Sequence, residues 1–211
     1  DNQQDFLEIY YQGANVLIEK RDFYDLTWAY LEKAHDQNIL HAKIFFDPKI
    51  HTGRGISFDH VVNGIGRALN KAEAQWGLTS KLICCILRHL DVQSGMETVE
   101  RAKDHRDRLI GIGLDSSELG FPPSMYREIF ENARNEGFRA VAHAGEEGPP
   151  EYETEALDIL KIDRLDHGNR ALEDAALVER LAAEQIALTI CPLTNLKLKG
   201  VARMEDHPLK L

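Results

Sequence analysis

The chain has 211 residues, three cysteines and a formal net charge of −10. Its 43% hydrophobic and 28% charged residues are ordinary for a soluble globular protein, and no apolar run approaches the ~20 residues that cross a bilayer. The negative charge disfavours nucleic acid as a partner, because phosphate backbones bind clustered Lys and Arg. An odd number of cysteines without metal-binding spacing favours reduced thiols. We therefore expect a cytoplasmic protein that binds a small molecule and contacts neither nucleic acid nor membrane.

Two predicted helices open the chain, one over residues 5–17 and one from residue 22, because apolar side chains recur there at helical spacing. Six β-rich runs follow, with helical patterns between them, at residues 39–46, 82–87, 109–114, 138–142, 164–168 and 186–190. Strands that alternate with helices at intervals of about 25 to 45 residues are typical of parallel βαβ units. Residues 51–55 and 196–211 show no clear period and are predicted to be loops.

An open doubly wound sheet and a closed barrel both fit this pattern, and the polar residues distinguish between them. Gly111 with Gly113, and Gly64 with Gly66, lack the third glycine of a dinucleotide-binding loop. Polar groups instead end nearly every predicted strand, which is characteristic of a barrel mouth. These groups are Asp47, Arg88 with His89, Asp115 to Glu118, His143 to Glu147, Asp166 with His167, and Thr194 with Asn195.

We predict an α/β fold of the TIM-type (β/α)₈ barrel class. Because such barrels need ~250 residues, the 211 residues are interpreted as a single, apparently truncated domain over residues 1–211.

The fourth predicted strand ends in His143, Gly145 and Glu146. A histidine three residues ahead of a glutamate allows a neutral imidazole to bind a metal while the turn at Gly145 brings the carboxyl group over the ligand. For an isolated HxxE pattern, a satisfied strand-end histidine beside solvated glutamates is the simpler interpretation. The surrounding motifs have to decide between the two.

Three motifs carry a family resemblance: HAGE at residues 143–146, RLDHG at residues 164–168 and CPLTN at residues 191–195. Their order and spacing resemble those of the adenosine/adenine deaminase family of metal-dependent barrels, and the resemblance extends over nearly the whole chain. Residues 45–55, 113–120 and 143–152 resemble most the members that act on free adenine.

The resemblance implies that His143 is a zinc ligand, that Glu146 is the proton donor and that His167 positions and polarises the metal-bound water. It further implies one Zn²⁺ per full-length chain and hydrolytic deamination of adenine to hypoxanthine and ammonia, a step of purine salvage. Glu118 and Asp115 are candidate substrate-binding residues. Adenosine deaminases have a glycine near the place of Glu118, so a carboxylate there would accept the ring N–H of free adenine and exclude ribose.

The chain also departs from the family pattern. The HxH motif of the family's first barrel strand and the Asp pair of its final strand are absent, so His143 alone remains of four expected ligands. The resemblance therefore implies that the chain covers about six central βα units of the barrel and lacks its first and last strands. We expect weak zinc binding by these residues alone. The alternatives are a deaminase of adenosine or of another 6-aminopurine derivative, and a metal-free barrel that only binds ligands. A cytidine-type deaminase is excluded because Cys191 lacks the partner cysteine of a PCxxC motif. The sequence does not predict the oligomeric state.

Overall fold

The computed structural model describes residues 3–210, and within them the strands form one six-stranded parallel sheet in the order β1 to β6. The strands are β1 His41–Phe46, β2 Thr79–Leu87, β3 Leu109–Asp115, β4 Arg139–Ala144, β5 Arg164–His167 and β6 Ala187–Thr189. The helices are α1 Gln3–Ala14, α2 Lys20–Asp36, α3 Pro48–Thr52, α4 Phe58–Trp76, α5 Val92–Ala102, α6 Arg127–Asn135, α7 Pro150–Glu155, α8 Ala175–Ala183 and α9 Pro192–Lys197.

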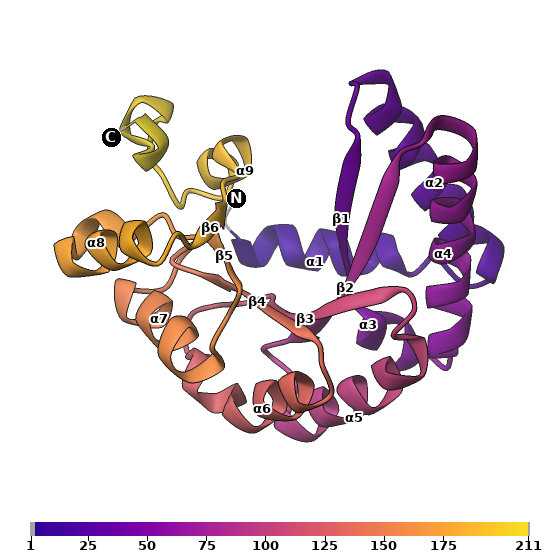
Figure 1. Cartoon of the computed structure of the whole chain (residues 1–211), viewed down its shortest axis with the longest axis horizontal. Helices are drawn as coiled ribbons and strands as arrows, with labels where there is room; N and C mark the ends of the chain where they lie inside the picture. Colours follow the sequence, from indigo (N-terminus) through magenta and orange to yellow (C-terminus); the bar gives the residue numbers. More distant parts are fainter. Residues whose placement is uncertain (1–2, 211) are drawn as a thin grey trace.

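The sheet confirms the predicted fold class. Each strand pairs in parallel with the strand that follows it in the chain, from β1–β2 to β5–β6. A doubly wound sheet would reverse its strand order at a switch point, and this sheet does not. Figure 1 shows the strands arranged in an arc, with most helices outside it, which is the arrangement of a partial TIM-type barrel.

Two predicted loops contain short helices. The segment expected as a loop at residues 51–55 begins within α3, whose last two residues are His51 and Thr52. Pro48 lies in the first turn of α3, where the fixed backbone angle of proline favours a helix start. The predicted tail loop begins within α9 and later forms the 3₁₀ turns Met204–Asp206 and Pro208–Lys210. Helices of one or two turns are too short to produce a recognisable hydrophobic period. None of the helices within residues 3–210 is long and apolar enough to span a bilayer.

The convex face of the sheet packs against the outer helices and forms the main core. Ile112 and Leu114 of β3 and Ala140 and Ala142 of β4 belong to this core. Their neighbours in the chain point the other way because side chains alternate along a strand. The helices are delimited by ordinary caps: the Ser57 side chain accepts the His60 N–H at 3.1 Å at the start of α4. The residues of the convex face therefore stabilise the fold and lie away from the opposite face.

The concave face carries much less apolar packing. Ile83, Cys85 and Val141 form a small buried cluster against Phe45, and polar side chains follow at the strand ends. Figure 1 shows α1 running across this inner side of the arc. The sequence predicted α1 as a helix but gave no reason to place it over the strand ends.

Candidate active site

A cavity of about 310 Å³ opens at the carboxyl ends of the strands, on the concave face and beneath α1. Side chains from α1 and from the ends of β1, β3, β4, β5 and β6 surround it. The polar members of its lining are Gln3, Tyr10, Tyr11, Asp47, Asp115, Ser116, His143, Glu146, Asp166, His167, Thr189 and Thr194. Most of the polar groups predicted at the strand ends lie in this lining, whereas others, among them Arg88, Glu118 and Asn195, lie outside it.

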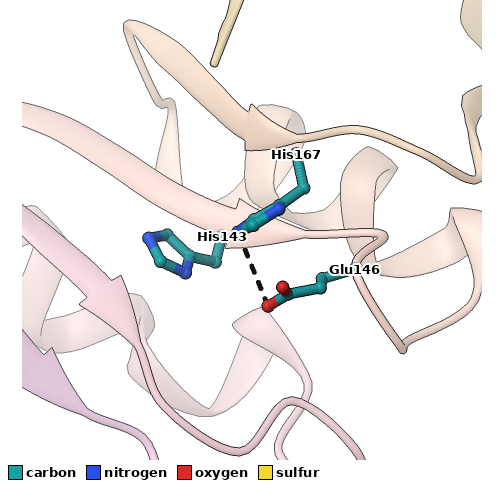
Figure 2. Close-up of side chains that lie close together, drawn as sticks. All are labelled: His143, Glu146 and His167. Carbon is teal, nitrogen blue, oxygen red and sulfur yellow. Dashed lines mark ion pairs between the residues drawn. The ribbon is translucent and has the colours of Figure 1, made fainter. Parts of the chain in front are cut away.

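Three predicted site residues converge in this cavity (Figure 2). His143 belongs to β4, Glu146 to the turn after it, and His167 to the end of β5, and donor atoms of all three lie within 4.8 Å of one another. The imidazole rings of His143 and His167 are 4.8 Å apart between centroids, and His167 Nε2 lies 3.5 Å from Glu146 Oε2. Adjacent parallel strands produce this arrangement, because Ala144 is in register with His167.

The cavity changes the protonation of all three groups. Burial and the cations of Arg88 and Arg164 lower the pKa of His143 to about 3. Burial and the neighbouring His143 lower the pKa of His167 to about 3. Burial raises the pKa of Glu146 to about 8, with a further contribution from the negative charges of Glu118 and Glu147. At neutral pH the site therefore contains neutral imidazoles and a protonated carboxyl group.

A chain of hydrogen bonds from the tail holds His167. Leu209 N–H donates to His207 Nδ1 at 3.1 Å, so a neutral His207 carries its proton on Nε2, which lies 3.2 Å from Asn195 Oδ1. The Asn195 amide nitrogen then donates to His167 Nδ1 at 3.2 Å. This assignment leaves the proton of a neutral His167 on Nε2, the nitrogen that faces Glu146.

The sequence did not indicate His207 as a site residue, because it lies in a tail without recognisable periodicity. The backbone at His167 is left-handed, with φ of 73°, which is uncommon outside glycine and occurs where surrounding contacts hold the residue.

Helix α1 supplies further contacts that sequence reasoning missed. Gln3 Nε2 donates to Glu146 Oε2 at 2.7 Å, and Tyr11 Oη lies 2.7 Å from Ser116 Oγ. Tyr10 Oη donates to Asp47 Oδ2 at 3.0 Å. Residues at the start of a chain carry no local signal that their helix will cross a distant strand end, so no motif could have identified them.

Asp115, a predicted substrate-binding residue, lies in the cavity and is paired with Asp47. Donor atoms of Asp47, Cys85 and Asp115 lie within 4.8 Å of one another, and both aspartates are at least nine-tenths buried. Burial, the negative charge of Asp47 and a hydrogen bond with Asp47 raise the pKa of Asp115, while burial raises the pKa of Asp47. The Oδ1 atom of each carboxyl group has no hydrogen-bond partner. The two carboxyl groups line the cavity at its β1–β3 side, and each keeps one buried oxygen without a hydrogen-bond partner.

The structure does not place Glu118 where a substrate contact requires it. Its carboxyl group is 1% exposed, lies outside the cavity lining and accepts four backbone N–H groups of residues 145–148. The Glu118 carboxyl group is therefore directed at the backbone of residues 145–148 and not at the space where a purine would bind. A single sequence could not separate these positions, because the loop after β3 can turn toward or away from the cavity.

The donor set fits a zinc site in part. Zinc binds neutral imidazole nitrogens, and His143 supplies one within reach of Glu146 and His167. His167 does not supply a second one, because its Nδ1 accepts a hydrogen bond from Asn195 and its Nε2 carries the proton. The fold and the cavity together define a class of protein: α/β barrels that carry a metal-binding site at the carboxyl ends of their strands.

Comparison with known proteins specifies the class. The sequence model described as adenosine deaminase matches residues 1–211, and the chain belongs to this family. A relative from Rhodospirillum rubrum described as adenine deaminase is 58% identical over 209 residues, which cover 99% of this chain and 63% of the relative. Another adenine deaminase, from Sphingopyxis alaskensis, is 56% identical over 210 residues, which cover 100% of this chain and 62% of that protein.

Solved structures agree with the family assignment. The crystal structure of an adenine deaminase from Arthrobacter aurescens superposes with a TM-score of 0.96 at 44% identity, covering 99% of this chain and 64% of that one. An amidohydrolase from Burkhoderia ambifaria with bound Zn gives a TM-score of 0.86 at 30% identity, covering 92% of this chain and 55% of that one. The chain thus spans about three-fifths of the length of these relatives.

Proposed function

We propose that the protein to which this chain belongs hydrolyses adenine to hypoxanthine and ammonia with the help of one zinc ion. The convergence of His143, Glu146 and His167 in one cavity carries the proposal. The high identity to relatives described as adenine deaminases supports adenine as the substrate. Purine salvage in the cytoplasm belongs to the same proposal.

Glu146 is the proton donor of the proposed reaction. With a pKa of about 8 its carboxyl group is protonated at neutral pH and can transfer a proton to ring nitrogen 1 of the purine as water adds to carbon 6. Protonation of that nitrogen removes the negative charge that addition would otherwise place on the ring. The same residue is within reach of the attacking water, because its carboxyl group lies 3.5 Å from His167.

His167 orients the attacking water. Its ring is held by Asn195 at Nδ1, so the Nε2 position faces the space shared with Glu146 and His143. A fixed ring reduces the reorganisation that the reaction requires.

His143 is the metal ligand of the proposal. A low pKa keeps its imidazole neutral, and a lone pair is available to a cation throughout the physiological range. Zinc held there would supply Lewis-acid chemistry toward the attacking water. The remaining ligands would come from sequence that this chain does not include, because none of its nine histidines is spaced HxH.

Asp115 and Asp47 contact a polar edge of the purine, and the reaction does not change this edge. The position of both side chains in the cavity lining supports this part of the proposal. Substitution of Asp115 by Asn should therefore raise KM for adenine by about tenfold and change kcat less, because such a contact is made equally in the ground state and the transition state. The identity to relatives described as adenine deaminases supports the preference for adenine over adenosine. The expected contact from Glu118 does not support it, because Glu118 lies outside the cavity lining.

The test uses the protein expressed with any sequence that flanks this chain in its gene. Metal content is measured by elemental analysis, and release of ammonia is measured from adenine, adenosine and N6-substituted adenines. We expect about one zinc per chain and a kcat/KM that is highest for adenine. Protein that holds no zinc, binds purines and releases no ammonia would support the alternative of a metal-free barrel that only binds ligands. A higher kcat/KM for adenosine would replace the proposed substrate within the family.

A further inference from the structure

Glu118 lies behind the turn that carries Glu146. Its Oε1 accepts the Gly145 N–H at 2.7 Å, and its Oε2 accepts N–H groups of the next three residues, at 3.0 Å from Glu146, 2.8 Å from Glu147 and 2.9 Å from Gly148. One carboxyl group thus binds four successive amides of a segment about 30 residues away in the chain. Only 1% of the surface of Glu118 is exposed, so water hardly competes with these amides for hydrogen bonds to the carboxyl group.

The two glycines make this arrangement possible. Gly145 has a φ of 71°, a left-handed conformation that turns successive N–H groups toward one point. A Cβ on Gly148 would lie 2.6 Å from Glu118 Oε1, so a side chain there would displace the carboxyl group. A Cβ on Gly145 would collide with the Glu153 carboxyl group on its other side. The HAGEEG segment is therefore shaped to surround the Glu118 carboxyl group.

A buried cation holds the same segment through a carbonyl group. The Arg88 guanidinium donates to the carbonyl oxygens of His143 and Phe121, and Arg88 is fully buried. Burial lowers the pKa of Arg88, and the negative charge of Glu118 acts in the opposite direction. The two charges thus offset each other across the turn, which reduces the cost of burying both.

We propose that Glu118 is a positioning residue that fixes the turn of residues 145–148 and thereby holds the Glu146 carboxyl group beside His167. The inference deepens the proposed function and rests on it for its catalytic consequence. The anchoring itself depends only on the contacts of Glu118. The position of Glu146 depends on this anchoring, because the backbone N–H of Glu146 is one of the four groups that donate to Glu118. A displacement of this turn by about 1 Å would be enough to lower turnover substantially.

Hydrogen exchange in the unmodified protein tests the anchoring without reference to activity. The amides of residues 145–148 should exchange at least ~10-fold more slowly than the amides of exposed loops. Glu118→Gln should accelerate their exchange by ~10-fold or more, because its amide group presents N–H donors where the turn requires acceptors. Glu151→Gln is the matched control, since Glu151 is an exposed glutamate shortly after the same turn. It should leave the four exchange rates unchanged.

Kinetics test the positioning. Glu118→Gln should lower kcat for adenine by ~10²-fold, change KM by less than about threefold and leave the zinc content unchanged. Glu118→Asp, which keeps the charge but is one methylene shorter, should recover part of both the exchange protection and kcat. It also provides a second variant if the glutamine substitution prevents folding.

The proposal has clear contrary outcomes. Exchange of the four amides at the rate of exposed loops in the unmodified protein would overturn it. So would a Glu118→Gln variant with unchanged kcat, or one that gains activity on adenosine while the amide exchange stays the same. Should the unmodified protein deaminate no aminopurine, the proposed function fails, whereas the exchange measurements still decide whether Glu118 anchors the turn.

Discussion

The two faces of the sheet differ in what their side chains contact. On the convex face, residues such as Ile112 and Leu165 are fully buried among the apolar side chains of the outer helices. On the concave face, Asp115 and His143 alternate with such residues and project into a cavity that is lined by both polar and apolar side chains. Because successive residues of a strand point to opposite sides of the sheet, one residue packs in the core while the next faces the cavity. Stability and chemistry can therefore be altered separately in this protein.

The largest effect is expected on the concave face, at His143. Replacing His143 by alanine should remove the bound metal and lower kcat/KM by ~10³-fold or more, because the metal loses an imidazole nitrogen as a ligand. Elemental analysis and steady-state kinetics on the same preparation measure both. His60→Ala, at an exposed histidine of α4, should change neither. Unchanged zinc stoichiometry in the His143 variant would remove His143 from the set of ligands.

The second effect is also on the concave face. Glu146→Gln should lower kcat by ~10²-fold or more and leave the zinc content unchanged, because glutamine cannot donate the proton that the carboxyl group supplies. The exposed Glu131 of α6 provides a control for the same substitution. Loss of zinc together with activity would instead identify Glu146 as a ligand.

The third effect should appear on the convex face alone. Ile112→Ala should lower the free energy of unfolding by about 2–5 kcal/mol, because it leaves a void in the core, while kcat per folded molecule stays nearly constant. Denaturant unfolding and active-site titration separate the two quantities. Ile110, on the same strand and 36% exposed, is the matched control, and its replacement by alanine should cost much less. A large decrease in kcat for Ile112→Ala would contradict the division between the faces.

The smallest effect concerns the pH dependence of stability. Burial of the Asp47–Asp115 pair raises both pKa values, so the native state binds more protons than the unfolded chain. The stability contributed by this pair is greatest below the ordinary aspartate pKa and declines as pH rises toward the raised values. Asp115→Asn should reduce that decline and raise the free energy of unfolding at pH 8 above that of the unmodified protein, because only the buried carboxyl group of Asp47 then remains to ionise.

Unfolding curves at pH 4 and pH 8 measure this effect. Asp36, exposed at the end of α2, provides the control substitution to Asn. An equal pH dependence in the unmodified protein and in Asp115→Asn would show that the pair does not share a buried environment in solution.

The sequence by itself determined the alternation of strands and helices and the positions of His143, Glu146 and His167. Hydrophobic periodicity is a local property, and parallel strands necessarily bring their carboxyl ends to one edge of a sheet. Strand limits were predicted within a few residues, whereas α3 and α9 were too short to produce a period.

Only the tertiary structure decided which polar residues face the cavity. Glu118 and Asp115 are three residues apart, yet one carboxyl group binds the backbone of residues 145–148 and the other faces the ligand space. Gln3 and His207 reach the site from opposite ends of the described chain. Such contacts depend on how a loop turns and on where a distant helix packs, because the energy that selects them comes from groups far apart in the sequence.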